Sequence, residues 1–162
     1  VALPAAVPSA DCTVVELVIA GAPVVAPTYL APDAIGVLTC SASDAQVTGS
    51  VTYEERHRNL GYWTDARSTA TWEARLPKAG KYRVALEYAS EPGCAGEIEV
   101  TIAGHAMRAA LPARSAWGDF ATQALGEADI PGGTPVQIVA RAAAMKGHAF
   151  INLRSITFTP VQ

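Results

Sequence analysis

The sequence has few charged residues and no cluster of one sign. Only 17% of its 162 residues are charged, and the formal net charge is −3. A surface that binds nucleic acid needs clustered lysine and arginine to neutralise phosphates, and the sequence has no such run. It also has no apolar run of the roughly 20 residues that a membrane-spanning helix requires. These absences argue against nucleic acid and membrane as partners.

Cysteine is also scarce. The three residues are Cys12, Cys40 and Cys94. Their number is odd and they contain no Cys-x-x-Cys pair, so we expect no zinc site. One disulfide with a free thiol, or three reduced thiols, both agree with the sequence. The histidines His57, His105 and His148 fall in expected loops or turns, with no helix to bring two of them to one metal.

The common catalytic motifs are missing as well. The sequence has no G-x-S-x-G, H-E-x-x-H, P-loop or G-x-G-x-x-G pattern. A glycosidase needs two carboxylates about 5–10 Å apart across a cleft. Glu54, Glu55, Asp65 and Asp119 offer such a set, but any β-sandwich with 15 acidic residues would do so. We expect a chain without catalytic activity; a small hydrolase, the alternative, would need paired carboxylates in a cleft, one with a raised pKa.

The clearest pattern present is strict alternation of apolar and polar residues in Thr69–Ala89. The residues that share the apolar faces of its two arms are Ala70, Trp72, Ala74 and Leu76, then Tyr82, Val84, Leu86 and Tyr88. Successive side chains leave a strand on opposite faces, so this period predicts two half-buried strands. Pro77–Gly80 has the residues of a turn between them. The segment therefore predicts an antiparallel hairpin within one sheet.

More short strands follow at intervals of roughly ten residues, separated by glycine and proline, which is typical of a sandwich. We expect them at Ile35–Cys40, Ala45–Glu55, Glu97–Ala103, Ala106–Leu111, Phe120–Glu127, Val136–Ala143 and Phe150–Thr159. Pro112–Asp119 is an expected loop that carries Trp117. The predicted fold is all-β, an antiparallel β-sandwich or jelly roll.

The expected domain boundary lies at residue 35. Residues 1–34 form a tail or linker with one strand, Thr13–Ile19, which is either the end of a preceding domain or an addition to the edge of the sandwich. Residues 35–162 form the sandwich itself. Val1–Ala10 lacks a basic region, so we interpret the start as a processed or excised end rather than a signal peptide.

Several short motifs in this order resemble a known family. They are Gly61-Tyr62-Trp63, Trp72, Lys78–Tyr82, Tyr88–Ser90, Trp117 and Asn152-Leu153-Arg154. Together they resemble the galactose-binding-like β-sandwich modules, in particular carbohydrate-binding modules of families 6 and 35, over about Ile35–Pro160. Upstream, Thr13–Val25, Val37–Thr39 and Asp44-Ala45 resemble the join that precedes such a module in the C-terminal regions of bacterial α-L-fucosidases.

The resemblance implies a sugar-binding site made of loop-borne aromatic rings and polar groups. Tyr62 and Trp63 match the position of the first aromatic residue and Trp117 that of the second. Asn152 matches an asparagine whose amide can donate to and accept from hydroxyls, and Arg154 and Asn59 are flanking donors. An aromatic contact adds roughly 0.5–1.5 kcal/mol beyond area burial, so we expect weak binding.

Structural roles are the alternatives for these residues. Trp72 alternates with core residues and is expected to pack in the core, and Trp63 could fill one end of the sandwich. Asn152 could satisfy backbone groups at the rim, and Arg154 could be a surface cation. A binding site requires Trp117 and Tyr62 or Trp63 to be exposed and to converge.

Members of this family commonly hold a structural calcium ion, which needs six to eight oxygen ligands. Asp44 and Glu54 lie near the expected positions, but Asn152-Leu153-Arg154 lacks the acidic residue that the family has in its last strand. Calcium is thus a possible structural ion, and no cofactor is required.

The favoured function is a non-catalytic carbohydrate-binding module, secreted or periplasmic. Its partners would be an oligo- or polysaccharide and the catalytic domain of a parent enzyme such as an α-L-fucosidase. The alternative is a structural accessory domain that packs on a catalytic domain, binds no sugar and exposes an apolar patch elsewhere.

Overall fold

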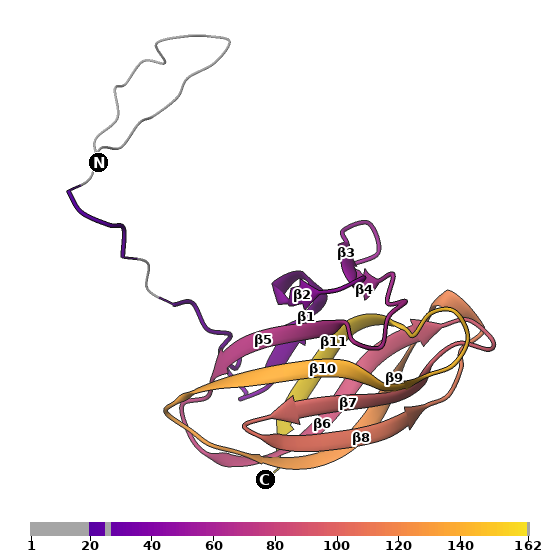
Figure 1. The fold of residues 1–162 in the computed structure, drawn as a ribbon. Helices are drawn as coiled ribbons and strands as arrows, with labels where there is room; N and C mark the ends of the chain where they lie inside the picture. The colour runs from indigo at the N-terminus through magenta and orange to yellow at the C-terminus, as the bar shows by residue number, and fades with distance from the viewer. Residues whose placement is uncertain (1–19, 25–26, 162) are drawn as a thin grey trace, which may run out of the picture.

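The alternating segments form two antiparallel β-sheets that pack face to face (Figure 1). The structure is a computed structural model that describes residues 20–24 and 27–161. Its strands are β1 (Leu38–Ser41), β2 (Gln46–Thr48), β3 (Thr52–Glu54), β4 (Asn59–Gly61), β5 (Thr69–Arg75), β6 (Gly80–Ser90), β7 (Gly96–Ile102), β8 (His105–Leu111), β9 (Ala116–Ile130), β10 (Pro135–Met145) and β11 (Asn152–Pro160). The prediction of an all-β antiparallel sandwich is confirmed.

Each sheet joins strands that are distant in the sequence. One sheet has six strands, ordered β3-β4-β11-β6-β9, with β1 also paired to β11. The other has five, ordered β2-β5-β10-β7-β8. The short helix η1 (Ala42–Asp44) follows β1. In the described part of the chain, no helix is long and apolar enough to cross a membrane.

The predicted hairpin of Thr69–Ala89 is wrong, although both of its strands form. β5 pairs with β2 and β10, whereas β6 pairs with β9 and β11, so the two strands lie in opposite sheets. Alternation reports which face of a strand is buried and says nothing about the neighbour to which the strand is hydrogen-bonded. The apolar faces of β5 and β6 meet across the core instead of lying side by side.

Two further predictions need correction. Ala45–Glu55 is not one strand, because it turns at Gly49 to give β2 and β3. The expected loop Pro112–Asp119 ends early, because β9 begins at Ala116 and pairs there with Ser90 of β6. Trp117 therefore lies on a strand, next to a loop.

A register shift in the last strand also changes which residues share a face. The sequence pattern places Asn152, Arg154, Ile156 and Phe158 together. In the pairing of β11 with β6 the register shifts between Leu153 and Ser155. Arg154 is therefore an extra residue on β11, a β-bulge. Such a bulge reverses which face of the sheet the following side chains point to. Ile156 and Phe158 are consequently buried, while Asn152 and Arg154 are partly exposed.

The core between the sheets is built around large aromatic residues. The largest fully buried side chains include Trp63, Trp72, Phe150 and Phe158. Trp72 has the core position expected for it, and its indole N–H donates a 2.8 Å hydrogen bond to the Ser41 carbonyl. Because this N–H has a partner, burying the indole leaves no unsatisfied donor.

Part of the expected tail contacts the sandwich. The Leu30 N–H donates to the Glu73 carbonyl at 2.9 Å, and the Leu30 carbonyl accepts from Arg75 N–H at 2.8 Å. Leu30 thereby forms a parallel bridge to Ala74 beside β5. The predicted strand Thr13–Ile19 lies outside the described residues.

Cys40 and Cys94 are both buried free thiols. Burial, helped by the negative charge of Asp44, raises the pKa of Cys40 to about 12. Since the thiolate is the reactive form, Cys40 is chemically inert at neutral pH. Cys12 lies outside the described residues.

Candidate functional site

A cavity of about 620 Å³ opens where the residues around β4, the start of β9 and the loop before β11 meet. This volume is within the usual range for small-molecule sites. The side chains that line it combine aromatic rings with polar groups; they are Glu54, Arg56, His57, Tyr62, Trp63, Thr64, Trp117, Phe120, His148, Ile151, Asn152 and Arg154, with Gly118 and Ala149. The structure thus brings five of the six predicted sugar-contacting residues together.

Tyr62 and Trp63 are neighbours in the sequence but lie in different environments. Tyr62 is 66% exposed, whereas Trp63 is 1% exposed. The Trp63 ring packs edge-on against Phe150 at 5.5 Å, and the Trp63 carbonyl accepts a 2.8 Å hydrogen bond from Phe150 N–H. Trp63 therefore belongs to the core beneath the cavity, and Tyr62 is the aromatic residue of this pair that a ligand can reach.

Trp117 forms a partly exposed wall of the cavity. Its carbonyl accepts a 3.0 Å hydrogen bond from the Asn152 side-chain amide, which ties β9 to β11. Its indole meets the His148 ring edge-on, with centroids 6.4 Å apart. The Asn152 amide thus satisfies a backbone carbonyl at the rim of the sandwich, while its side-chain oxygen remains available as an acceptor.

The loop that leads into Trp117 is fixed by Asp119. The carboxylate accepts from the Ser115 hydroxyl at 2.7 Å and from Arg114 at 3.1 Å. These hydrogen bonds, the one from Ser115 first, lower the pKa of Asp119 below its usual value. Asp119 is therefore ionised at neutral pH and holds the first residues of β9 in place.

Arg154 is held between two partners. Its guanidinium lies 3.5 Å from the centre of the Phe120 ring and forms a 2.8 Å ion pair with Glu87. Both contacts restrain a side chain that otherwise has many rotamers. Arg154 can still donate from its remaining N–H groups into the cavity.

Asn59 is fully buried and does not line the cavity. Its side-chain amide donates to the Glu54 carboxylate at 2.8 Å, and its side-chain oxygen has no partner among the described residues. A Cβ on Gly61 would overlap the Glu54 carboxylate and lie 3.1 Å from the Asn152 oxygen. Asn59 and Gly61 thus position Glu54, and Gly61 leaves room for both polar groups.

The two candidate calcium ligands are in different settings. Asp44 is exposed at the end of η1, and Glu54 lines the cavity, where it is already hydrogen-bonded to Asn59. Among the described residues, neither belongs to a cluster of three or more acidic, histidine or cysteine side chains. Two carboxylates do not supply the six oxygens that calcium needs. The calcium site stays a prediction.

The sequence did not identify Glu54, His148 or Phe120 as cavity residues. The family resemblance implies a calcium-binding role for Glu54 and not a role in the cavity. His148 reaches Trp117 from a loop that is 31 positions away in the sequence, and no local pattern reports such a contact. Phe120 could have been found from alternation, since Gly118 and Phe120 both line the cavity and are two residues apart on β9.

Comparisons with known proteins agree with this fold. No protein-family model and no curated protein matches the sequence. Solved carbohydrate-binding modules of families 35 and 6 match in structure. A family 35 module from Clostridium thermocellum has a TM-score of 0.63 and 18% identity, over 78% of this chain and 99% of that one.

Two larger proteins match through one part of their chains. The GH26-CBM35 β-(1,4)-mannanase of Podospora anserina has a TM-score of 0.61 and 18% identity, over 79% of this chain and 28% of that one. The Cry4Aa toxin of Bacillus thuringiensis has a TM-score of 0.62 and 15% identity, over 83% of this chain and 25% of that one.

Identities this low establish a common fold and not a common ligand, as the presence of a toxin among the matches illustrates. None of the three proteins described above is named a fucosidase. The chain has the two-sheet β-sandwich fold of the family 35 and family 6 carbohydrate-binding modules.

Proposed function

We propose that this chain is a non-catalytic carbohydrate-binding module that holds a glycan in the cavity beside Tyr62 and Trp117. The observation that carries the proposal is the convergence of two accessible aromatic rings with the Asn152 and Glu54 oxygens and the Arg154 guanidinium in one cavity. Aromatic rings stack on the apolar C–H faces of a pyranose, and the polar groups bind its hydroxyls. Exposed Tyr62 and partly exposed Trp117 meet the requirement for such a site.

A hydrolase is less well supported. Glycoside hydrolysis needs two carboxyl groups across the scissile bond, one with a raised pKa. Glu54 is the single carboxylate among the residues that line the cavity. The carboxyl groups with a resolved shift, those of Asp65, Glu99 and Asp119, all have lowered pKa values. Binding without catalysis suits this arrangement.

The wider setting follows from the resemblance and the structural matches. The partners we propose are an oligo- or polysaccharide and the catalytic domain of a secreted or periplasmic glycan-degrading enzyme, with an α-L-fucosidase as the candidate that the upstream sequence suggests. An accessory domain that binds no sugar is the second candidate. In addition to Tyr62, the large apolar side chains exposed in the described residues are Val24, Ile35 and Val47, which an accessory domain could use for packing.

The test is a glycan-array screen, followed by calorimetry, of the wild type and the Trp117→Ala variant with fucosylated, galactosylated and xylan-type ligands. We expect weak binding that falls at least about tenfold in the variant, since one aromatic contact and its buried area exceed ~1.4 kcal/mol. Val47→Ala, exposed on β2 and outside the cavity, is the control and should bind as the wild type does.

The circular dichroism spectrum must be unchanged in both variants. If the wild type binds no glycan at millimolar concentration, the module proposal fails and the accessory domain replaces it. If Trp117→Ala binds glycan as well as Val47→Ala and the wild type do, the cavity is not the binding site.

A further inference from the structure

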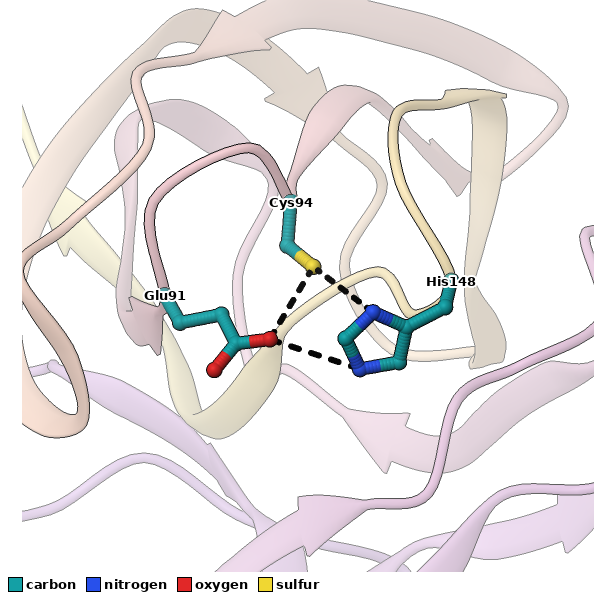
Figure 2. Close-up of side chains that lie close together, drawn as sticks. All are labelled: Glu91, Cys94 and His148. Atoms are coloured by element: carbon teal, nitrogen blue, oxygen red, sulfur yellow. Dashed lines mark hydrogen bonds and ion pairs between the residues drawn. The ribbon is translucent and has the colours of Figure 1, made fainter.

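Three potential metal ligands converge at the base of the loop that carries His148. Figure 2 shows the side chains of Glu91, Cys94 and His148 pointing toward one another from two loops. The Cys94 sulfur lies 3.8 Å from Glu91 Oε1 and 3.8 Å from His148 Nδ1, and His148 Nε2 lies 3.4 Å from Glu91 Oε1. One ligand atom of each residue is within 4.8 Å of the other two.

The two 3.8 Å distances from the Cys94 sulfur, to Glu91 Oε1 and to His148 Nδ1, are near the distances between ligand atoms in a tetrahedral zinc site. Zinc binds Cys sulfur at about 2.3 Å and His nitrogen or carboxylate oxygen at about 2.0–2.2 Å, so two ligand atoms at the tetrahedral angle lie roughly 3.4–3.6 Å apart. The ion would take one ring nitrogen, whereas the Cys94 sulfur contacts Nδ1 and the Glu91 oxygen contacts Nε2. With one nitrogen as the ligand, the three ligand atoms lie within 4.8 Å of one another, so the exposed His148 ring has to turn toward the other two ligands when the ion binds. Thiolate, imidazole and carboxylate together match the borderline-soft character of zinc.

The first loop places two of the ligands by a tight turn. Cys94 N–H donates to the Glu91 carbonyl at 3.1 Å, and between them stand Pro92 and Gly93, the latter with φ of +84°. Proline at the second position of a turn, followed by a residue with positive φ at the third, is typical of a type II turn. The turn holds positions i and i+3 close together, which brings the Glu91 and Cys94 side chains to one place.

The second loop is tied against the first. Ala95 N–H donates to the Phe150 carbonyl at 2.9 Å, and Lys146 N–H donates to the Ala95 carbonyl at 2.8 Å. Gly147, with φ of +68°, passes so close that a Cβ there would lie 3.0 Å from the Cys94 sulfur and 2.6 Å from the Gly93 carbonyl oxygen. The backbone therefore holds the two loops side by side before any ion binds, which lowers the cost of ordering the site.

We propose that Glu91, Cys94 and His148 bind one Zn²⁺ ion, with water as the fourth ligand. The His148 side chain is 73% exposed, so solvent reaches that side of the site. On binding, the Cys94 thiol gives its proton to solvent and coordinates as thiolate, and no redox change occurs. The ion would also fix the His148 ring beside Trp117, and so one wall of the cavity.

A cysteine nucleophile with a histidine base is the chemical alternative for these residues. In such a triad the acid lies beyond the imidazole, on the side away from the sulfur. Here Glu91 Oε1 does contact the far nitrogen, His148 Nε2, at 3.4 Å, but it also contacts the Cys94 sulfur directly at 3.8 Å, as close as His148 Nδ1. Cys94 is also only 3% exposed, which denies a substrate access to the sulfur. The convergence of the three side chains on one point favours a bound metal ion over a catalytic triad.

The test is calorimetric titration of chelator-treated, reduced full chain with Zn²⁺, accompanied by Co²⁺ spectroscopy. We expect one ion per chain, and for Co²⁺ the thiolate-to-metal charge-transfer band together with the d–d bands of a tetrahedral site. Removal of a residue that merely orients a ligand weakens metal binding 10–100-fold. Loss of a ligand in Cys94→Ser or His148→Gln should therefore weaken it by about 100-fold or more.

The matched controls are Cys40→Ala, which removes the other buried thiol of the described residues, and His105→Gln, which removes an exposed histidine on β8. Both should bind zinc as the wild type does. Because the His148 side chain is exposed, His148→Gln should fold normally. It therefore still tests the proposal if Cys94→Ser fails to fold. Absence of stoichiometric binding, or binding that His148→Gln leaves unchanged, overturns the proposal and leaves a hydrogen-bonded polar cluster. No sugar is present, so the result is independent of glycan binding.

Discussion

Trp63 and Tyr62 show how two adjacent aromatic residues divide structural and binding roles. Trp63 is buried against Phe150, and Tyr62 is exposed at the cavity. Tyr62 has a φ of +55°, an unusual value for a residue with a side chain. The loop presents one ring to the solvent while the next fills the core.

We predict that Trp63→Ala lowers the free energy of unfolding by about 3–5 kcal/mol, the usual cost of removing a large buried aromatic residue. Tyr62→Ala should change it by less than about 0.5 kcal/mol, because the ring is mostly exposed. Urea denaturation followed by far-ultraviolet circular dichroism measures both. Similar losses in the two variants would contradict the division of roles.

At the scale of the strand, Glu99 ties three strands of one sheet together. It lies opposite Arg108 of β8 and Arg141 of β10, and accepts from both guanidinium groups at 2.6 Å. The two arginines cover the carboxylate, and the Glu99 residue is only 5% exposed. Their hydrogen bonds, that from Arg108 first, lower the pKa of Glu99 below its ordinary value of 4.5.

A pH dependence follows from this shift. Because the pKa is lower in the folded than in the unfolded chain, the ion pairs stabilise the fold above about pH 4.5, and this contribution is lost as the pH falls through the lower, folded value. Glu99→Gln should therefore be less stable than the wild type at pH 7, and the gap should narrow in acid. The control is Glu97→Gln. Glu97 lies on the same strand and forms no ion pair among the described residues.

Urea denaturation at several pH values measures the gap between the wild type and Glu99→Gln. A gap that does not change with pH would show that the two arginines do not stabilise the ionised form of Glu99.

The connection between the sheets gives another prediction at this scale. The loop that carries the chain from β5 to β6 packs against the loop before β10, where a Cβ on Gly132 would overlap the backbone of Lys78 and Ala79. Gly133 N–H also donates to the Leu76 carbonyl at 2.8 Å. This contact stabilises the crossing between the sheets.

Gly132→Ala should lower the free energy of unfolding by about 1–3 kcal/mol, the usual cost of overpacking against a backbone that cannot move away easily. Gly118→Ala, where a Cβ meets nothing within 4 Å, should have little effect. Chemical denaturation of both variants is the measurement, and equal stabilities would refute the packing argument.

Over the whole molecule, the sequence was sufficient for the fold class and most strands. The alternation in β5, β6 and β7 arises because one face of each strand is buried. Burial selects an apolar residue at every second position, so the pattern can be recognised within a short stretch of sequence. Pairing between strands is a long-range property, so the assignment of β5 and β6 to one sheet was wrong. The register shift in β11 was equally hidden, because a bulge depends on the neighbouring strand.

Residues of the cavity could be predicted from the sequence where the chain carries distinctive short motifs. They could not be predicted where the cavity depends on contacts between distant segments. Tyr62, Trp117 and Asn152 were identified from short motifs and do line one cavity. The cluster of Glu91, Cys94 and His148 was missed because the expected signature was a pair of spaced cysteines. Glu91-Pro92-Gly93-Cys94 predicts a turn that brings its ends together, but His148 is 54 residues away from Cys94.

The position of β11 has a kinetic consequence. This strand is made late, at Asn152–Pro160, yet it lies inside the six-stranded sheet and pairs with β1, β4 and β6. A chain still emerging from the ribosome cannot complete that sheet until these residues are free. Pairings between distant segments also slow folding, into the millisecond-to-second range for comparable β-sandwiches. Until β11 is synthesised and paired, the apolar faces of the earlier strands of this sheet are therefore open to aggregation.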